Sequence, residues 1–174
     1  IDRDYKFLVS TLSGDRTESF GLGNIYTTRQ MKQWIEFFLG TREWSDKTFF
    51  EDNKNLFHDY LLPHLPSVSS EAQLLDRRVK VGDEFISHIS VADVFIFTCG
   101  LTEQWVTRCD ETLTICPGTV VGKYDPEQHY FINLDFSDIL HDLSKIEEYI
   151  LKLNPGINFI YTVSPVPLTA TAEE

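Results

Sequence analysis

Cysteine is scarce in this 174-residue chain, and its three cysteines, Cys99, Cys109 and Cys116, form no C-x-x-C pair. Zinc ribbons need such paired thiols, so the spacing gives no support to a structural metal site. An odd number of cysteines in a chain of this size also argues against a disulfide framework, and reduced thiols are the simplest interpretation. Cys99 ends an apolar run, which favours a place in the core over a role as a nucleophile.

Recognisable catalytic and metal-binding motifs are also missing. None of the five histidines stands four residues from another, as the two zinc ligands of an H-E-x-x-H helix would. Ser164 follows an apolar run and has Val163 and Pro165 as its neighbours. The G-x-S-x-G pattern of a nucleophile elbow is absent around it. Proline also has no N–H to contribute to an oxyanion hole, so Ser164 is predicted to belong to a turn. We therefore predict no metal and no cofactor, and no Ser-His-Asp set can be assembled from the spacing.

Basic residues and long apolar runs are in short supply as well. The 15 basic residues are outnumbered by 27 acidic ones, and the net charge of -12 repels phosphate backbones, so no nucleic-acid partner is expected. No apolar run approaches the roughly 20 residues of a membrane-spanning helix. The first residues, "IDRDYKFLVS", lack the basic start and long apolar stretch of a signal peptide. A cytoplasmic protein, or a fragment whose ends are missing, is the expectation.

The apolar residues that are present suffice for one packed α/β domain over residues 1–174. Hydrophobic residues make up 42% of the chain, and 13 of them are phenylalanine. Apolar positions recur with helical spacing in three segments, which predicts helices at about 28–39, 71–87 and 136–153. Thr27 and Gln30 form a predicted capping box for the first helix, and Gly40 ends it. Strands are predicted at about 5–10, 92–98, 112–116 and 157–163.

Two of these predicted strands, 92–98 and 157–163, are apolar on both faces and each follows a predicted helix. That pattern is typical of parallel strands buried between layers of helices. The predicted fold is therefore a three-layer α/β/α sandwich with a mainly parallel sheet.

Open sheets of this kind bind ligands beyond the carboxyl ends of their strands, where Gly100, Thr102 and Glu103 would lie. Glu103 is either a carboxylate at the N-terminus of a helix or a general base or acceptor for a substrate. The Gly23-Asn24 loop precedes the first helix. It is either a turn or a place where the backbone approaches a ligand and the Asn24 amide donates to an oxyanion.

Four segments together resemble successive blocks of the GSCFA-domain proteins, which are usually bacterial and related to the SGNH (GDSL-like) hydrolases. These segments are "GLGNIYTTRQMKQWIEFFLG", "DVFIFTCGLTEQW", "CPGTVVGKYDPEQHYFINLDF" and "NPGINFIYTVSPVPLTATA". The resemblance implies a flavodoxin-like hydrolase fold and chemistry on an acyl ester, with a Ser nucleophile in an early block and a His near the end. Carried over by position, Gly23 with Asn24 and Gly100 with Thr102-Glu103 match middle blocks that help to form the oxyanion hole.

The chain departs from the family pattern at both ends. The Gly-Ser-Cys-Phe-Ala motif is absent, and no His follows "TATA" before Glu174. The resemblance therefore implies an incomplete domain whose Ser and His lie outside the chain. The predicted function is that of an SGNH-type hydrolase or acyltransferase acting on an ester-bearing small molecule or an acylated glycan. The alternative is a binding module that keeps the fold but lacks the two catalytic residues.

Overall fold

The computed structural model describes residues 21–166 and 171–172, so the strand predicted at 5–10 lies outside the described residues. The described residues form three helices and seven strands, with a short 3₁₀ turn at Asp46–Thr48. The helices are α1 (Thr28–Phe38), α2 (Glu71–Ile89) and α3 (Phe136–Leu153). The strands are β1 (Phe49–Glu51), β2 (Phe57–Asp59), β3 (Val94–Cys99), β4 (Glu103–Thr107), β5 (Thr112–Leu113), β6 (His129–Asn133) and β7 (Asn158–Val163).

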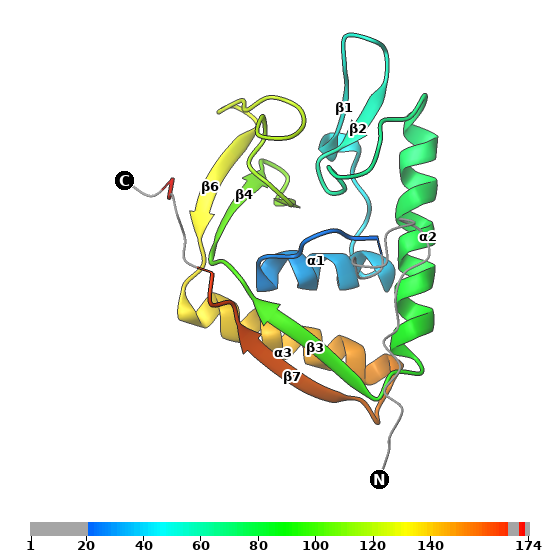
Figure 1. Ribbon diagram of the computed structural model, residues 1–174, viewed down its shortest axis with the longest axis vertical. Helices are drawn as coiled ribbons and strands as arrows, with labels where there is room; N and C mark the ends of the chain where they lie inside the picture. The colour runs from blue at the N-terminus through cyan, green and yellow to red at the C-terminus, as the bar shows by residue number, and fades with distance from the viewer. Residues whose placement is uncertain (1–20, 167–170, 173–174) are drawn as a thin grey trace.

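The predicted three-layer sandwich with a mainly parallel sheet is wrong. The described strands form three small sheets: an antiparallel β1–β2 pair, a parallel β3–β7 pair and an antiparallel sheet in the order β5-β4-β6. The chain leaves β3 and enters β4 within a few residues, where the prediction had placed a loop or the start of a helix. Figure 1 shows β4 and β6 rising away from the β3–β7 pair rather than extending it.

Helices α1 and α3 confirm the predictions made from apolar spacing. The Thr27 hydroxyl accepts the Gln30 N–H at 3.1 Å, which is one half of the predicted capping box. The other half differs, because the Gln30 side chain accepts the N–H of Tyr26 at 3.0 Å. Asp135 caps α3 and forms a complete box with Asp138.

Helix α2 crosses α1 at Gly82, which is the only glycine in α2. A Cβ atom at Gly82 would lie 2.7 Å from Cδ1 of Phe38, so the absence of a side chain allows the two helices to approach. Leu75 and Val79, near the start of α2, are 39% and 51% exposed. Arg78, which lies between them in the sequence, is buried instead.

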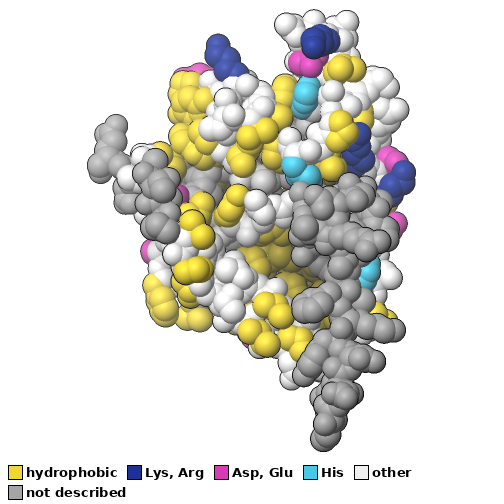
Figure 2. All heavy atoms as spheres, in the orientation of Figure 1, with side chains coloured by type: hydrophobic (Ala, Val, Ile, Leu, Met, Phe, Trp, Pro, Cys, Tyr) yellow, Lys and Arg dark blue, Asp and Glu magenta, His cyan; other side chains and the backbone are white. Residues whose placement is uncertain are grey.

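The β3–β7 pair is buried on one face only, although both faces are apolar. Phe95 and Phe97 point into the core and are almost fully buried, whereas Ile96 is 58% exposed and Ile160 is 46% exposed. In Figure 1 this pair lies in front of α3, and Figure 2 shows hydrophobic side chains gathered on the same face of the molecule. The described residues therefore cover the helix-facing side of the pair and leave its other side open.

Helix α1 lies at the centre of the molecule and contributes to two apolar clusters (Figure 1). Met31 and Ile35 pack in the cluster with α2, α3 and the β3–β7 pair. Trp34 and Phe37 pack in the cluster formed with residues 60–62 and with Leu113 of β5. Within the described residues, no helix combines the length and apolar character needed to cross a membrane.

Candidate functional site

A cavity of about 300 Å³ lies between the N-terminal end of α1 and the β5-β4-β6 sheet. We call it the Glu103 cavity, because this predicted site residue is in its wall. Aromatic and aliphatic side chains share the wall with amides and hydroxyls. The lining residues are Tyr26, Thr27, Gln30, Leu101, Glu103, Gln104, Trp105, Leu113, Thr114, Ile115, Cys116, Thr119 and Phe131.

The two loops that sequence analysis singled out meet at Tyr26, which lines this cavity. The N–H groups of Gly100 and Leu101 both donate to the backbone oxygen of Tyr26, at 3.0 and 2.9 Å. The Asn24 side chain donates from Nδ2 to the Tyr26 hydroxyl at 3.0 Å. The structure therefore brings the Gly23-Asn24 loop and the Gly100–Glu103 segment to one place.

Both glycines in these loops allow a close approach to another residue. Gly23 has φ +68°, and a Cβ atom there would lie 2.7 Å from Nδ1 of His64. A Cβ atom at Gly100 would lie 3.2 Å from the Tyr26 oxygen. In this arrangement the Gly100 N–H is already bound to Tyr26 and cannot also donate to an oxyanion in the cavity.

Glu103 is the first residue of β4 and Thr102 directly precedes it, so neither stands at the start of a helix. Glu103 pairs with Asn133 of β6, so its interpretation as a carboxylate at a helix N-terminus is wrong. The Thr171 hydroxyl donates to Oε1 of Glu103. Thr102 is exposed, and its backbone oxygen accepts the Leu134 N–H at 2.9 Å, so its contribution is to the backbone of the sheet.

Buried amides, which sequence reasoning missed, form much of the polar wall. The Thr27 hydroxyl donates to Oε1 of Gln104 at 2.7 Å, and Nε2 of Gln30 donates to the Thr114 hydroxyl at 3.1 Å. All four residues are at most 8% exposed. Buried amides and hydroxyls must find such partners, which gives this wall a fixed geometry.

A third amide, Gln33, joins the same side of α1 to β5. Its Oε1 accepts the Thr112 N–H at 2.7 Å, and its Nε2 donates to the Thr112 oxygen at 3.0 Å. Thr27, Gln30 and Gln33 stand three residues apart and so share one side of the helix. This polar stripe was visible in the sequence and could have indicated the network.

Comparison with known proteins decides the family. A family model, that of the GSCFA family, matches residues 4–173. The chain belongs to the GSCFA family. The resemblance noted from the four sequence segments is thereby confirmed, while the relationship to SGNH hydrolases remains a prediction. No curated protein and no solved structure matches the chain.

The GSCFA chain offers no activated nucleophile among the described residues that line the Glu103 cavity. Burial raises the pKa of the Cys116 thiol, which disfavours the reactive thiolate at neutral pH. The Thr27 hydroxyl donates to Gln104 in the wall, and the Thr114 hydroxyl donates to the backbone oxygen of Leu61. The described residues also hold no group of three or more His, Cys, Asp or Glu side chains that could bind a metal ion.

Other candidate groups of this GSCFA chain have structural roles away from the cavity. The Ser164 N–H donates to the Cys99 oxygen at 2.9 Å, and the Ser164 hydroxyl accepts the Val166 N–H at 3.2 Å. Ser164 thus has a structural role directly after β7, and its hydroxyl is engaged by the backbone. His58 lies 3.0 Å from a carboxylate oxygen of Asp52 in the β1–β2 hairpin, outside the cavity lining.

Proposed function

We propose that this chain supplies the substrate cavity of an SGNH-type enzyme that hydrolyses or transfers an acyl ester. The observation that carries the proposal is the Glu103 cavity itself, formed where the two predicted loops meet. Its volume of about 300 Å³ lies at the lower end of the ~300–1,000 Å³ typical of small-molecule sites. Membership of the GSCFA family supports the same assignment.

The mixed wall suits an ester. Leu101, Trp105 and Phe131 offer apolar surface to an acyl chain. The Glu103 carboxylate can accept a hydrogen bond from a hydroxyl of the alcohol or glycan part of the substrate.

The proposal assigns the chemical step to groups outside the described residues. A serine attacks the ester carbonyl, a histidine takes its proton, and the acyl group passes from the alcohol to the serine and then to water or a second alcohol. Asn24 and Gly100 act on Tyr26, because their donor groups are directed to it. In this scheme they position Tyr26 at the cavity instead of donating to the oxyanion.

Covalent labelling by a serine-directed phosphonate tests this proposal on the full-length protein. Leu101→Trp places an indole in the cavity wall, whereas Leu75→Trp adds the same side chain on the exposed side of α2. We expect labelling of the wild type and of Leu75→Trp, and labelling about tenfold slower in Leu101→Trp because an interaction of about 1.4 kcal/mol is lost. A wild-type protein that stays unlabelled while a control esterase reacts would contradict the enzymatic assignment.

A binding module is the second candidate, and the lack of an activated nucleophile in the described wall favours it. The cavity would then hold an ester-bearing small molecule or glycan without turnover. Calorimetric binding of a non-hydrolysed short-chain ester, weakened in Leu101→Trp and unaffected in Leu75→Trp, distinguishes this case when no phosphonate label appears.

A further inference from the structure

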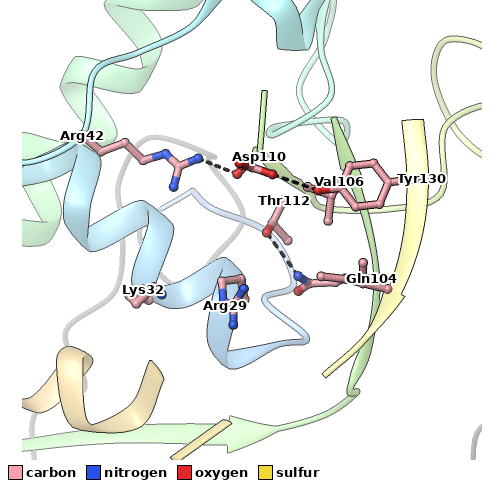
Figure 3. A pocket seen from close by; sticks show the side chains of 9 residues that line it. Arg29, Lys32, Arg42, Gln104, Val106, Asp110, Thr112 and Tyr130 are labelled. Carbon is pink, nitrogen blue, oxygen red and sulfur yellow. Dashed lines mark hydrogen bonds between the residues drawn. The ribbon is translucent and has the colours of Figure 1, made fainter. Parts of the chain in front are cut away.

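A second cavity, of about 350 Å³, lies between α1 and the β4–β6 strands, on the other side of Gln104 from the Glu103 cavity. Figure 3 shows that Arg29 and Lys32 approach it from α1 and Arg42 from the segment after that helix. We call it the Arg29 cavity. Its lining residues are Arg29, Lys32, Arg42, Gln104, Val106, Asp110, Thr112, Tyr130 and Ile132.

All three cations are paired with carboxylates that do not line the cavity. Arg29 donates from Nε to Asp142 at 2.7 Å and from Nη2 to Asp138 at 2.9 Å, and Lys32 donates to Asp142 at 2.6 Å. Asp142 is fully buried in α3. These contacts fix the two cationic groups in place, which lowers the entropy cost of binding an anion.

The third cation, Arg42, is fixed at the opposite end, where its Nη1 lies 3.7 Å from a carboxylate oxygen of Glu36. Its Nη2 donates to the backbone oxygen of Asp110 at 2.5 Å, and its guanidinium lies 5.4 Å from the centre of the Phe37 ring. Asp110 is the one acidic residue among the described lining residues, and its carboxylate accepts the Tyr130 hydroxyl at 2.9 Å. Figure 3 shows Asp110 held between Arg42 and Tyr130.

We propose that the Arg29 cavity binds a small oxyanion, the phosphoryl or carboxylate group of a small molecule. Guanidinium groups bind such oxygens with paired N–H donors, and an ammonium adds a compact charge. Three cations from separate positions on the chain surround a space large enough for the group. The net charge of -12 makes the protein as a whole unfavourable to anions, so saturable anion binding requires a local site of this kind.

Titration of the whole chain with inorganic phosphate at constant ionic strength tests the proposal. A parallel titration with acetate tests binding of a carboxylate, and chloride is the background anion in both. Arg42→Gln is the principal variant, because Arg42 is not a partner of the buried Asp142 and its loss leaves that carboxylate paired. Lys47→Gln removes an equally charged but exposed residue and serves as the control. Circular dichroism spectra establish that each variant is folded.

We expect saturable binding of phosphate or acetate by the wild type and by Lys47→Gln, and affinity about tenfold lower in Arg42→Gln, the scale of one charge-assisted hydrogen bond. Tighter binding of phosphate than of acetate assigns a phosphoryl ligand, and the reverse order assigns a carboxylate. Arg29→Lys keeps a positive charge beside Asp142 but removes the planar guanidinium with its paired N–H donors. This variant should also bind the anion more weakly. Absence of saturable binding by both anions, or equal affinities in Arg42→Gln and Lys47→Gln, would overturn the proposal.

Discussion

Helix α1 is held on two sides by polar contacts of different kinds. Toward α3 the contacts are ionic, with Arg29 and Lys32 around the buried Asp142; we call this the ionic interface. Toward β5 they are neutral, with Gln30 and Gln33 bonded to Thr114 and Thr112; this is the amide interface. Both interfaces border the cavities, yet they depend on their partners in different ways.

The difference lies in what remains when one partner is removed. A buried charge without its counter-ion keeps the full cost of desolvation, so the ionic interface requires every member. In the amide interface, loss of a side chain leaves neutral backbone groups without a hydrogen-bond partner. An unpaired neutral group costs less free energy than an unpaired buried charge. β5 has only two residues, Thr112 and Leu113, so the amide contacts also position a strand that is too short to be held by its own ladder.

Removal of the central carboxylate should give the largest effect. Asp142→Asn keeps the volume but leaves Arg29 and Lys32 without their buried counter-ion, and we expect the free energy of unfolding to fall by about 3 kcal/mol. Asp138 lies one turn earlier on α3, and its side chain is 43% exposed. Asp138→Asn removes a second ion pair of Arg29 and should lower the free energy of unfolding by less than about 1 kcal/mol. Urea unfolding of both variants measures the two values. Equal losses would show that burial of Asp142 does not set the strength of the ionic interface.

Loss of one amide should cost less. Gln33→Met preserves the length of the side chain but leaves the N–H and C=O of Thr112 unpaired, and we expect a loss of about 2 kcal/mol. The same change at the exposed Gln128 should alter stability by less than about 0.5 kcal/mol. Thermal or urea unfolding provides the measurement. A Gln33→Met variant as stable as Gln128→Met would mean that water replaces the amide and that the interface does not fix β5.

The helices could be predicted from sequence because their evidence is local. The apolar residues of α1 and α3 recur every three or four positions, and the caps at Thr27 and Asp135 stand next to them. The sheets could not be predicted, because their pairing is not local. β4 and β6 are five residues each, and nothing in either segment shows that the two pair with each other rather than with the β3–β7 pair.

The candidate site was predictable in part for the same reason. The rule that polar residues follow apolar strands singled out Gly100 and Glu103, and the position of a Gly-Asn pair before a helix singled out Gly23-Asn24. The amide and ionic interfaces were missed, because a search for apolar periodicity passes over the polar sides of a helix. Arg29 and Asp142 are 113 positions apart, and only the packing of α3 on α1 brings them together.

Glu111 places a charge beside the neutral amide interface and gives the smallest and most specific test. It precedes Thr112, is 2% exposed, and neither of its carboxylate oxygens has a hydrogen-bond partner among the described residues. Burial raises the pKa of this carboxyl above its ordinary value of 4.5, with Arg78, the nearby Ser45 hydroxyl and Arg42 opposing the shift. The folded protein therefore holds the Glu111 proton more tightly than the unfolded chain does.

The sign of the pH dependence follows from this shift. Stability from protonated Glu111 is fully present below the unfolded pKa and is lost as the pH rises through the raised, folded pKa. Glu111→Gln mimics the protonated form at every pH, so its free energy of unfolding should exceed that of the wild type at pH 7, and this advantage should shrink toward pH 4.5. Urea unfolding across this range measures it, with Glu127→Gln, an exposed position, expected to follow the wild-type profile. A constant difference between Glu111→Gln and the wild type at every pH would mean that the carboxylate is hydrated in the folded protein, and that the amide interface tolerates a charge because water reaches it.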